Sequence, residues 1–264
     1  MPPRHLPGTS AHAGSSSRTE SRHLGQVRSF DQEDGAAAVG SLAPPEDELK
    51  LLGNLRGQRV LELGCGDGGS LVWLAEAGAA ELWGLDVSAS QLISARQQLD
   101  ARQLSARVIQ SSFEDAVGLP EQYFDLAVSV FALGWAIGLD AVMARIANCL
   151  RPGGRLVFSW EHPFFSLLAE REGQVIVGES YLGHGRPQHR SFHGVEVVLV
   201  ARSLGDWIAA LQGSGLILEG LIEPDLDERQ LVEHHRESGY VYSSAKASRV
   251  PTTFIMAAHK PGAS

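Results

Sequence analysis

The sequence has few cysteines and no long hydrophobic segment. Cys65 and Cys149 are its only cysteines, and they do not form a Cys-x-x-Cys pair. This number excludes a disulfide framework and is typical of a protein in a reducing cytosol. No apolar run approaches the roughly 20 residues that a membrane-spanning helix needs. The N-terminal residues lack the apolar core of a secretory signal. We therefore expect a cytoplasmic protein.

Basic residues are outnumbered by acidic ones. Lysine and arginine total 22 against 31 aspartates and glutamates, which gives a formal net charge of -9. No segment is rich in lysine or arginine. Nucleic-acid affinity depends on the neutralisation of phosphates by cationic side chains. We therefore expect neither nucleic acid nor an anionic membrane as a partner, and a small molecule is the better candidate.

Elements of two kinds alternate along most of the chain. Residues 1–30 are rich in Ser, Gly, Pro, Arg and His, and they predict a disordered tail because they lack apolar residues. Residues 31–264 form one predicted domain. Strands are predicted at 59–63, 81–86, 106–110, 123–130, 155–160, 195–200, 216–224 and 252–260. Helices are predicted from Pro45 onward and at 69–78, 89–103, 139–150 and 203–215.

This alternation predicts an α/β fold with a doubly wound, Rossmann-like sheet and helices on both faces. Residues 161–194 interrupt the pattern with Gly, His, Pro and aromatic residues that show no period. We interpret them as an insertion over the ends of the strands that shapes a substrate pocket.

The most informative motif is the glycine-rich run at residues 60–71, which reads VLELGCGDGGSL. A strand enters a turn whose glycines allow close approach of a ligand, and a helix N-terminus follows. Asp86 lies about 20 residues downstream, where an acidic residue can bind ribose hydroxyls. Gly64, Gly66 and Gly69 also satisfy the spacing G-x-G-x-x-G, so an NAD(P)-dependent oxidoreductase remains an alternative.

The segment ELGCGDG, which begins at Glu62, resembles motif I of class I S-adenosylmethionine (SAM)-dependent methyltransferases. Three later segments, GLDVSASQL, FDLAVSVFAL and LRPGGRLVFSW, are similar to further motifs of that family in the same order. The resemblance covers residues 55–160 and points to the type-11-like small-molecule group. It implies SAM as the cofactor and a mostly parallel sheet with an antiparallel last strand. It also assigns to the cofactor Glu62, Gly64, Cys65, Gly66, Asp86, Val87, Gln91, Ser112, Phe113 and Val130.

Two of these assignments need comment. In the family the acid at position 62 helps to hold the cationic aminoacyl end of SAM, whereas a pyrophosphate would be repelled by it. The family often has an aspartate followed by an apolar residue in its third motif, where this chain has Ser112 and Phe113. The contact to the adenine amino group is therefore in doubt. Phe113 has two equal interpretations, as a residue beside the adenine ring or as a core aromatic.

The acceptor side is expected around the fifth predicted strand. His162 and Glu161 leave that strand at the ligand-binding edge of the sheet. Imidazole titrates near neutrality, so His162 is the candidate base, or else it orients the acceptor. The His-Pro run here resembles that of type-11-like methyltransferases. Trp135, Tyr181 and His184 are further candidates for substrate contact.

Two other patterns are interpreted as coincidental. The histidines at 184, 189 and 193 do not have the spacing of a zinc site, so no metal is expected. Tyr242 and Lys246 form Tyr-x-x-x-Lys, the pair of short-chain dehydrogenases. They lie in a polar connection, and no T-G-x-x-x-G-x-G fingerprint precedes them.

The sequence thus predicts an enzyme that transfers a methyl group from SAM to an oxygen or nitrogen atom of a small molecule, with carbon as the next choice. Bacterial specialised metabolism is the expected setting. A SAM-binding protein without catalytic activity is the second alternative, beside the oxidoreductase. The sequence does not determine the oligomeric state, and a homodimer is only the usual possibility, because it is the commonest oligomer.

Overall fold

The computed structural model describes residues 43–182, 185, 187–192, 195–225 and 243–262. For residues 188–192 and 195–197 it gives the backbone alone. The predicted tail, His184 and Tyr242 therefore lie outside the described residues. Within the described ranges, no helix has the length and apolar character needed to cross a bilayer.

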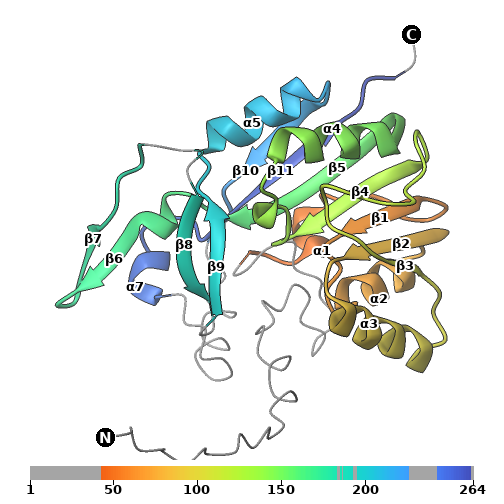
Figure 1. The fold of residues 1–264 in the computed structure, drawn as a ribbon, viewed down its shortest axis with the longest axis horizontal. Helices are drawn as coiled ribbons and strands as arrows, with labels where there is room; N and C mark the ends of the chain where they lie inside the picture. The colour runs from red at the N-terminus through yellow and green to blue at the C-terminus, as the bar shows by residue number, and fades with distance from the viewer. Residues whose placement is uncertain (1–42, 183–184, 186, 193–194, 226–242, 263–264) are drawn as a thin grey trace, which may run out of the picture.

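A seven-stranded sheet forms the centre of the described chain, in the order β10-β11-β5-β4-β1-β2-β3 (Figure 1). The strands are β1 (Arg59–Leu63), β2 (Glu81–Asp86), β3 (Arg107–Gln110), β4 (Phe124–Val130), β5 (Leu150–Glu161), β10 (Ile217–Ile222) and β11 (Thr253–His259). β11 runs antiparallel to both of its neighbours, and the other pairs are parallel. The prediction of a mostly parallel sheet with an antiparallel last strand is confirmed.

Helices cover both faces of this sheet (Figure 1). They are α1 (Glu46–Leu49), α2 (Gly69–Glu76), α3 (Ala89–Ala101), α4 (Leu139–Cys149) and α5 (Leu204–Gly213), with a short 3-10 helix η1 (Leu133–Trp135) after β4. Met143 of α4 and Trp207 of α5 pack in one core cluster with Phe158. Leu71 of α2 and Leu92 of α3 pack in a second cluster on the other face. The doubly wound arrangement is therefore confirmed.

Two helix starts follow from local sequence. The hydroxyl of Ser88 accepts a hydrogen bond from the Gln91 N–H at the start of α3. At the start of α5, Ser203 Oγ accepts from the Asp206 N–H at 3.1 Å, and Asp206 Oδ2 accepts from the Ser203 N–H at 2.7 Å. This reciprocal pair is a capping box, and it satisfies two backbone donors that the helix leaves open.

The predicted insertion carries more regular structure than the sequence indicated. It contains η2 (Phe165–Leu167) and the antiparallel pair of β6 (Leu168–Arg171) with β7 (Gln174–Val177), and its strand β8 (Pro187–Phe192) pairs antiparallel with β9 (Val195–Val200), the strand predicted at 195–200. A short helix α7 (Ser244–Ala247) lies against β6. The turn between β6 and β7 is Glu172-Gly173, and both residues have positive φ. That conformation matches a two-residue hairpin turn.

The insertion stands at the carboxyl edge of the parallel strands. Figure 1 shows the β8–β9 hairpin beyond the carboxyl ends of β4 and β5, with β6 and β7 farther out. The backbone of β9 lies against η1. In open α/β sheets this edge is where ligands bind. The fold therefore brings the glycine-rich turn, η1 and the insertion to one edge.

Candidate active site

The glycine-rich turn is held against the ends of β2 and β4. The N–H groups of Gly64 and Cys65 donate to Leu85 O at 2.7 and 3.1 Å. Gly64 has a φ of 76°, and a Cβ placed on it would lie 2.2 Å from Ala132 Cβ. Only glycine allows the segment after β4 to come this close. The turn after β1 therefore touches the end of β2 and the segment that follows β4.

Asp86 is oriented by two backbone donors at this edge. Its Oδ2 accepts from the Gly66 N–H at 3.0 Å, and its Oδ1 accepts from the Ser88 N–H at 2.8 Å. An ionised carboxylate has about four acceptor sites. Two such sites remain for ligand hydroxyls, and the space around Gly66 is open, since a Cβ there would meet nothing within 4 Å.

Glu62 carries a buried carboxyl group that is only half satisfied. Its side chain is 1% exposed, Oε1 accepts a hydrogen bond from Ser70 Oγ, and Oε2 has no partner. Burial raises the pKa of Glu62 to about 8, against the Ser70 bond, and the nearby charges of Asp86 and Asp67 add to the rise. An unpaired buried acid is costly unless a cation reaches it. The site is thus built to receive positive charge next to Oε2.

Phe113 lies beside the turn. A Cβ on Gly64 would be 3.4 Å from Phe113 Cζ, and the ring also packs against the core. Both interpretations of Phe113 therefore have structural support. The neighbouring Ser112 donates through its hydroxyl to Asp115 Oδ2 at 2.9 Å and accepts from the Asp115 N–H. Its side chain thus shapes the turn that carries Phe113.

The other predicted cofactor residues differ in how far their side chains are exposed and in whether the side chain or the backbone faces outward. Cys65 points into the core, where a Cβ on Gly84 would lie 2.9 Å from its Sγ, so only its backbone faces outward. Burial raises the pKa of the Cys65 thiol. Val130 is 4% exposed at the end of β4, whereas Val87 is 68% exposed. Gln91 contributes its backbone N–H to the Ser88 cap.

The imidazole of His162 is 7% exposed and engaged at both nitrogens. Nε2 lies 2.7 Å from Glu223 Oε1, and Nδ1 accepts from the Phe164 N–H at 3.2 Å. Because Nδ1 is an acceptor, this network assigns the proton to Nε2, which donates to Glu223. The backbone N–H of His162 donates to Thr252 O at 2.9 Å. His162 therefore links the end of β5 to Glu223, which follows β10, and to Thr252, which precedes β11.

The remaining predicted acceptor residues are spread along the edge. Trp135 lies on η1 with its ring 5.7 Å from that of Trp160. Glu161 is half-buried at the end of β5, in register with Thr253. Tyr181 is 38% exposed and packs edge-on against Phe164 at 6.5 Å.

Four residues of this edge were not singled out from the sequence: Ser70, Trp160, Glu223 and Arg202. Ser70 is the second residue of α2, and its hydroxyl faces back toward Glu62 of β1. Glu223 lies near the carboxyl end of the strand predicted at 216–224, which is a signal that could have been used. Arg202 precedes a helix cap, and nothing local distinguishes it.

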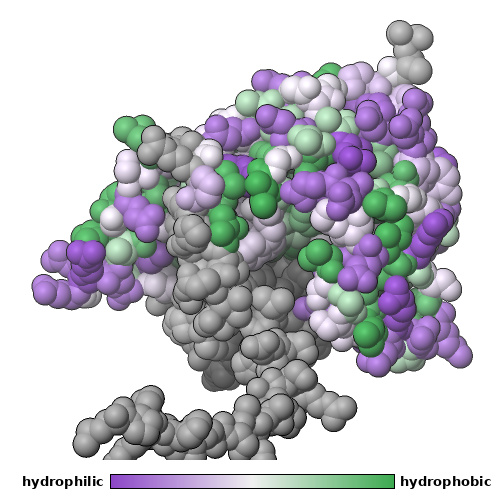
Figure 2. Space-filling view, in the orientation of Figure 1, coloured by the Kyte–Doolittle hydropathy of each residue, from purple (hydrophilic) through white to green (hydrophobic). Residues whose placement is uncertain are grey.

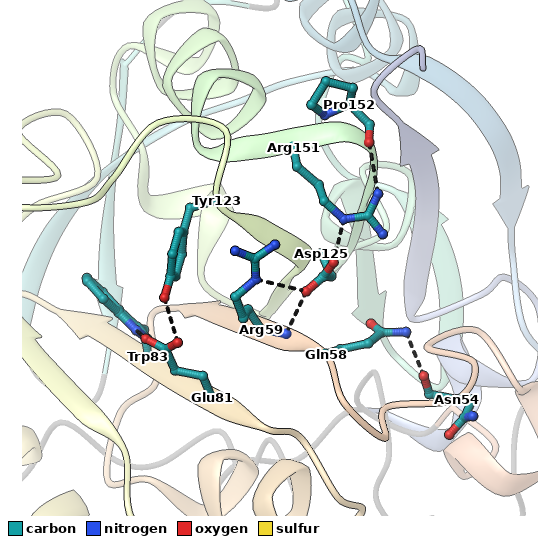
Figure 3. Close-up of polar contacts among 9 residues, drawn as sticks. All are labelled: Asn54, Gln58, Arg59, Glu81, Trp83, Tyr123, Asp125, Arg151 and Pro152. Atoms are coloured by element: carbon teal, nitrogen blue, oxygen red, sulfur yellow. Dashed lines mark hydrogen bonds and ion pairs between the residues drawn. The ribbon is translucent and has the colours of Figure 1, made fainter. Parts of the chain in front are cut away.

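The opposite edge of the sheet carries a different polar cluster. Figure 3 shows Asp125 between Arg59 and Arg151, and Tyr123 and Trp83 both donating to Glu81. These residues lie at the amino ends of the strands and satisfy one another. They brace the sheet, away from the edge where the glycine-rich turn lies.

Known proteins resemble this chain in sequence and structure. A family described as a methyltransferase domain matches residues 60–154. A crystal structure of a SAM-dependent methyltransferase from Mesorhizobium loti is 26% identical, with a TM-score of 0.66, and the match covers 80% of this chain and 95% of that one. The O-methyltransferase cnsE of Penicillium expansum is 32% identical over 235 residues, which cover 85% of this chain and 84% of the relative. This chain belongs to the SAM-dependent methyltransferases.

Other relatives match a smaller part. An uncharacterized protein of Haemophilus influenzae is 37% identical over 127 residues, and the match spans 47% of this methyltransferase and 50% of the relative. A malonyl-[acyl-carrier protein] O-methyltransferase of Enterobacter lignolyticus is 35% identical over 141 residues, which are 49% of this chain and 54% of that one. Family membership overturns the oxidoreductase alternative.

The geometry of this methyltransferase fits SAM as its cofactor. The free Oε2 of Glu62 is a buried acceptor for a cationic group, and Asp86 keeps acceptor sites for ribose hydroxyls. The charges of Asp67 and Asp86, which also act on Glu62, make the turn unfavourable for a pyrophosphate. The residues that would hold SAM are thus Glu62 and Asp86, with the backbone around Gly64 and Gly66.

Proposed function

We propose that this protein transfers the methyl group of SAM to an oxygen atom of a small-molecule acceptor. The observation that carries this proposal is the 32% identity to an O-methyltransferase over most of both chains. A His–Glu pair at the carboxyl edge supports it, because a hydroxyl acceptor must lose a proton. Nitrogen and carbon acceptors are the alternatives, and a setting in bacterial specialised metabolism completes the proposal.

When bound, SAM supplies an electrophilic methyl carbon on a good leaving group. The protein has to align the acceptor atom with that carbon, and such alignment contributes up to about 7–11 kcal/mol in favourable cases. Glu62, Asp86 and the glycine-rich turn would hold the cofactor at one side. The insertion and η1 would hold the acceptor at the other side of the same edge.

His162 is the proton acceptor in this proposal, and Glu223 is its positioning residue. The bond from Nε2–H to Glu223 keeps the lone pair on Nδ1, as the aspartate does in Ser-His-Asp sites. The acceptor hydroxyl would take the place that the Phe164 N–H occupies at Nδ1. The imidazolium formed would be stabilised by the carboxylate of Glu223. This step requires the turn at residues 163–165 to move aside.

The test is transfer of labelled methyl from SAM to a panel of phenols, carboxylic acids and amines, read by mass spectrometry. We expect methylated oxygen in the products. His162→Ala should lower kcat about 100-fold or more, because the proton then has no acceptor. Glu223→Gln should lower kcat less, since an amide oxygen can still accept from Nε2–H.

The matched control is His259→Ala, which removes a second His–Glu pair. His259 Nδ1 lies 3.1 Å from Glu219 Oε1 at the other end of the sheet. This variant should keep the wild-type kcat and pH profile. Unchanged turnover in His162→Ala would remove His162 from the mechanism. SAM binding without transfer to any acceptor would instead favour the non-catalytic alternative.

A small-molecule acceptor implies that this methyltransferase acts without a macromolecular substrate. The formal charge of -9 supports the exclusion of nucleic acid in this proposal. A homodimer and a cytoplasmic location stay part of the proposal as well. The bacterial setting is supported only by the excess of arginine over lysine, which is typical of a GC-rich bacterial source. Three of the basic residues are lysines, and the others are arginines.

A further inference from the structure

Three aromatic residues meet at the carboxyl edge, next to the turn that would hold the cofactor. Phe131 follows β4, and its N–H donates to Ser159 O at 3.2 Å. The ring of the next β5 residue, Trp160, lies 5.8 Å from that of Phe131 and 5.7 Å from that of Trp135. We call Phe131, Trp135 and Trp160 the aromatic wall. Its rings are tilted or perpendicular to one another, as aromatic pairs prefer.

The wall depends on a close approach of backbone and indole. A Cβ on Gly134 would lie 1.8 Å from Trp160 Cε2, so any side chain there would displace the indole. Phe131 has a φ of 50°, a left-handed conformation that is uncommon outside glycine, Asn and Asp. Backbone strain of this kind persists where surrounding structure enforces it, and it clusters at functional sites.

Arg202 fixes the segment that carries the wall. Its guanidinium donates to Gly134 O at 3.3 Å, to Ala136 O, and to Ile137 O at 3.1 Å. The side chain is buried, and burial lowers its pKa although the charge of Asp206 acts in the opposite direction. Burial of a cation against backbone carbonyls is costly. A fold that needed only a packed loop could use an apolar residue here, so the arrangement indicates a segment whose position matters.

The wall lies between the cofactor turn and the insertion. On one side, Ala132 comes within contact of Gly64, as the short approach to its Cβ position shows. On the other side, β9 lies against η1, and Arg202 is the second residue after β9. Figure 2 shows hydrophobic residues where β9 and η1 meet, and Val198 and Ile137 are 45% and 71% exposed. A molecule held between the turn and the insertion would therefore meet these rings.

We propose that the aromatic wall receives a planar, apolar part of the methyl acceptor, and that Arg202 is the positioning residue that holds the wall. This inference rests on the proposed methyl transfer. It narrows the acceptor class to molecules with an aromatic or conjugated ring system bearing the hydroxyl. Flat rings gain from offset and edge contacts with aromatic side chains, whereas saturated rings of the same skeleton do not gain in this way.

The test compares two probes on protein saturated with S-adenosylhomocysteine, so that no transfer occurs. Isothermal titration measures the affinities of 2-naphthol and of decahydro-2-naphthol, its saturated counterpart. We expect 2-naphthol to bind about tenfold more tightly. Trp135→Leu should abolish that preference and leave the affinity for the saturated probe unchanged. Trp73→Leu removes an indole from α2, which is not part of the aromatic wall, and should leave the preference intact.

Arg202 is tested by two substitutions. Arg202→Met should remove the preference for 2-naphthol and raise the acceptor KM more than it lowers kcat, with unchanged affinity for S-adenosylhomocysteine. Arg202→Lys keeps donors for the carbonyls and should restore part of the preference, which protects the test if the methionine variant fails to fold.

Three results would overturn the proposal that the aromatic wall receives the acceptor. They are equal affinities for the two probes, no binding of 2-naphthol, or an equal loss of the preference in Trp135→Leu and Trp73→Leu. If Arg202→Lys loses the preference completely, Arg202 does not act by holding the carbonyls. Failure of the protein to bind S-adenosylhomocysteine would instead contradict the cofactor site and the proposed function. The two failures are therefore distinguishable.

Discussion

At the residue scale, the burial of Glu62 at the cofactor turn costs folding free energy. Glu62 is 1% exposed, and one of its carboxyl oxygens has no hydrogen-bond partner. Ser70 satisfies the other oxygen, so the carboxyl is oriented even without a ligand. The ligand-free protein therefore keeps Glu62 protonated near neutral pH, and a bound cation would favour its ionised form. Burial of such a residue lowers the stability of the ligand-free fold, and it raises the affinity of the site for a cationic ligand.

Glu62→Gln should change how stability depends on pH. The folded pKa of about 8 exceeds the ordinary value of 4.5, so between these values the folded chain holds a proton that the unfolded chain lacks. Stability contributed by this proton is fully present below the lower value and is lost as pH rises to the upper one. The loss amounts to at most about 5 kcal/mol, and Glu62→Gln should remove it.

Urea unfolding of the ligand-free protein between about pH 5 and pH 9 measures this slope. Glu76→Gln is the control, because Glu76 lies at the end of α2, the helix that follows the turn, and is exposed. Its pH dependence should equal that of the wild type. A Glu62→Gln variant with the wild-type slope would show that Glu62 is ionised in the ligand-free protein.

At the scale of elements, the contact between α2 and α3 restricts which residue can stand at position 68, where the glycine-rich turn ends and α2 begins. Gly68 is the N-cap of α2, with a φ of 90°. A Cβ there would lie 2.8 Å from the Cα of Ala95 in α3. The glycine therefore serves two purposes, a left-handed backbone and room for the neighbouring helix. The close contact of Gly68 with α3, together with the glycine-rich motif, therefore decides where α2 begins.

Gly68→Ala should cost stability through both effects. The left-handed backbone contributes about 1–2 kcal/mol, and the forced separation of α2 and α3 adds about 1–3 kcal/mol. Gly57→Ala is the matched control, because Gly57 has a φ of 79° and a Cβ there would meet nothing within 4 Å. Urea midpoints of the two variants isolate the second effect. Equal losses would mean that α3 does not limit position 68.

At the scale of the whole molecule, bracing and binding lie at opposite edges of the sheet. Asp125 Oδ2 accepts from the Arg59 N–H at 2.8 Å and from its Nε at 3.3 Å, while Oδ1 accepts from Arg151 (Figure 3). This carboxylate ties the first residue of β1 to β4 and β5 at their amino ends. The glycine-rich turn, by contrast, follows the carboxyl end of β1.

Asp125→Asn should therefore separate stability from cofactor binding. The side chain is 14% exposed, and loss of hydrogen bonds to a charged group costs about 1.5–3 kcal/mol. The affinity for S-adenosylhomocysteine, measured by titration at a temperature where the variant is folded, should not change. Asp140→Asn, at an exposed position in α4, should alter neither quantity. A weakened affinity in Asp125→Asn would show that the two edges are coupled.

Much of the fold was predictable because its causes are local. The strands at Arg59–Leu63 and Glu81–Asp86 agree with the prediction residue for residue, since both are apolar runs bounded by turn residues. Ser88 and Ser203 marked helix starts through their own hydroxyls. The β6–β7 hairpin was missed, although Glu172-Gly173 at its turn was a usable signal, because its strands are short and do not alternate clearly.

The candidate cofactor site was likewise present in the sequence, since Glu62, Asp86 and the glycines lie in motifs that one strand end and one turn bring together. The acceptor side was not. His162 meets Glu223 across 61 residues, and Arg202 reaches Gly134 across 68. Such contacts depend on which strands become neighbours and on how the insertion returns to the sheet. Sequence alone determined the fold class, which follows from local patterns, and it indicated the cofactor through local motifs that resemble those of a known family. The tertiary structure decided the partners of His162 and the aromatic wall, because only folding brings distant segments into contact.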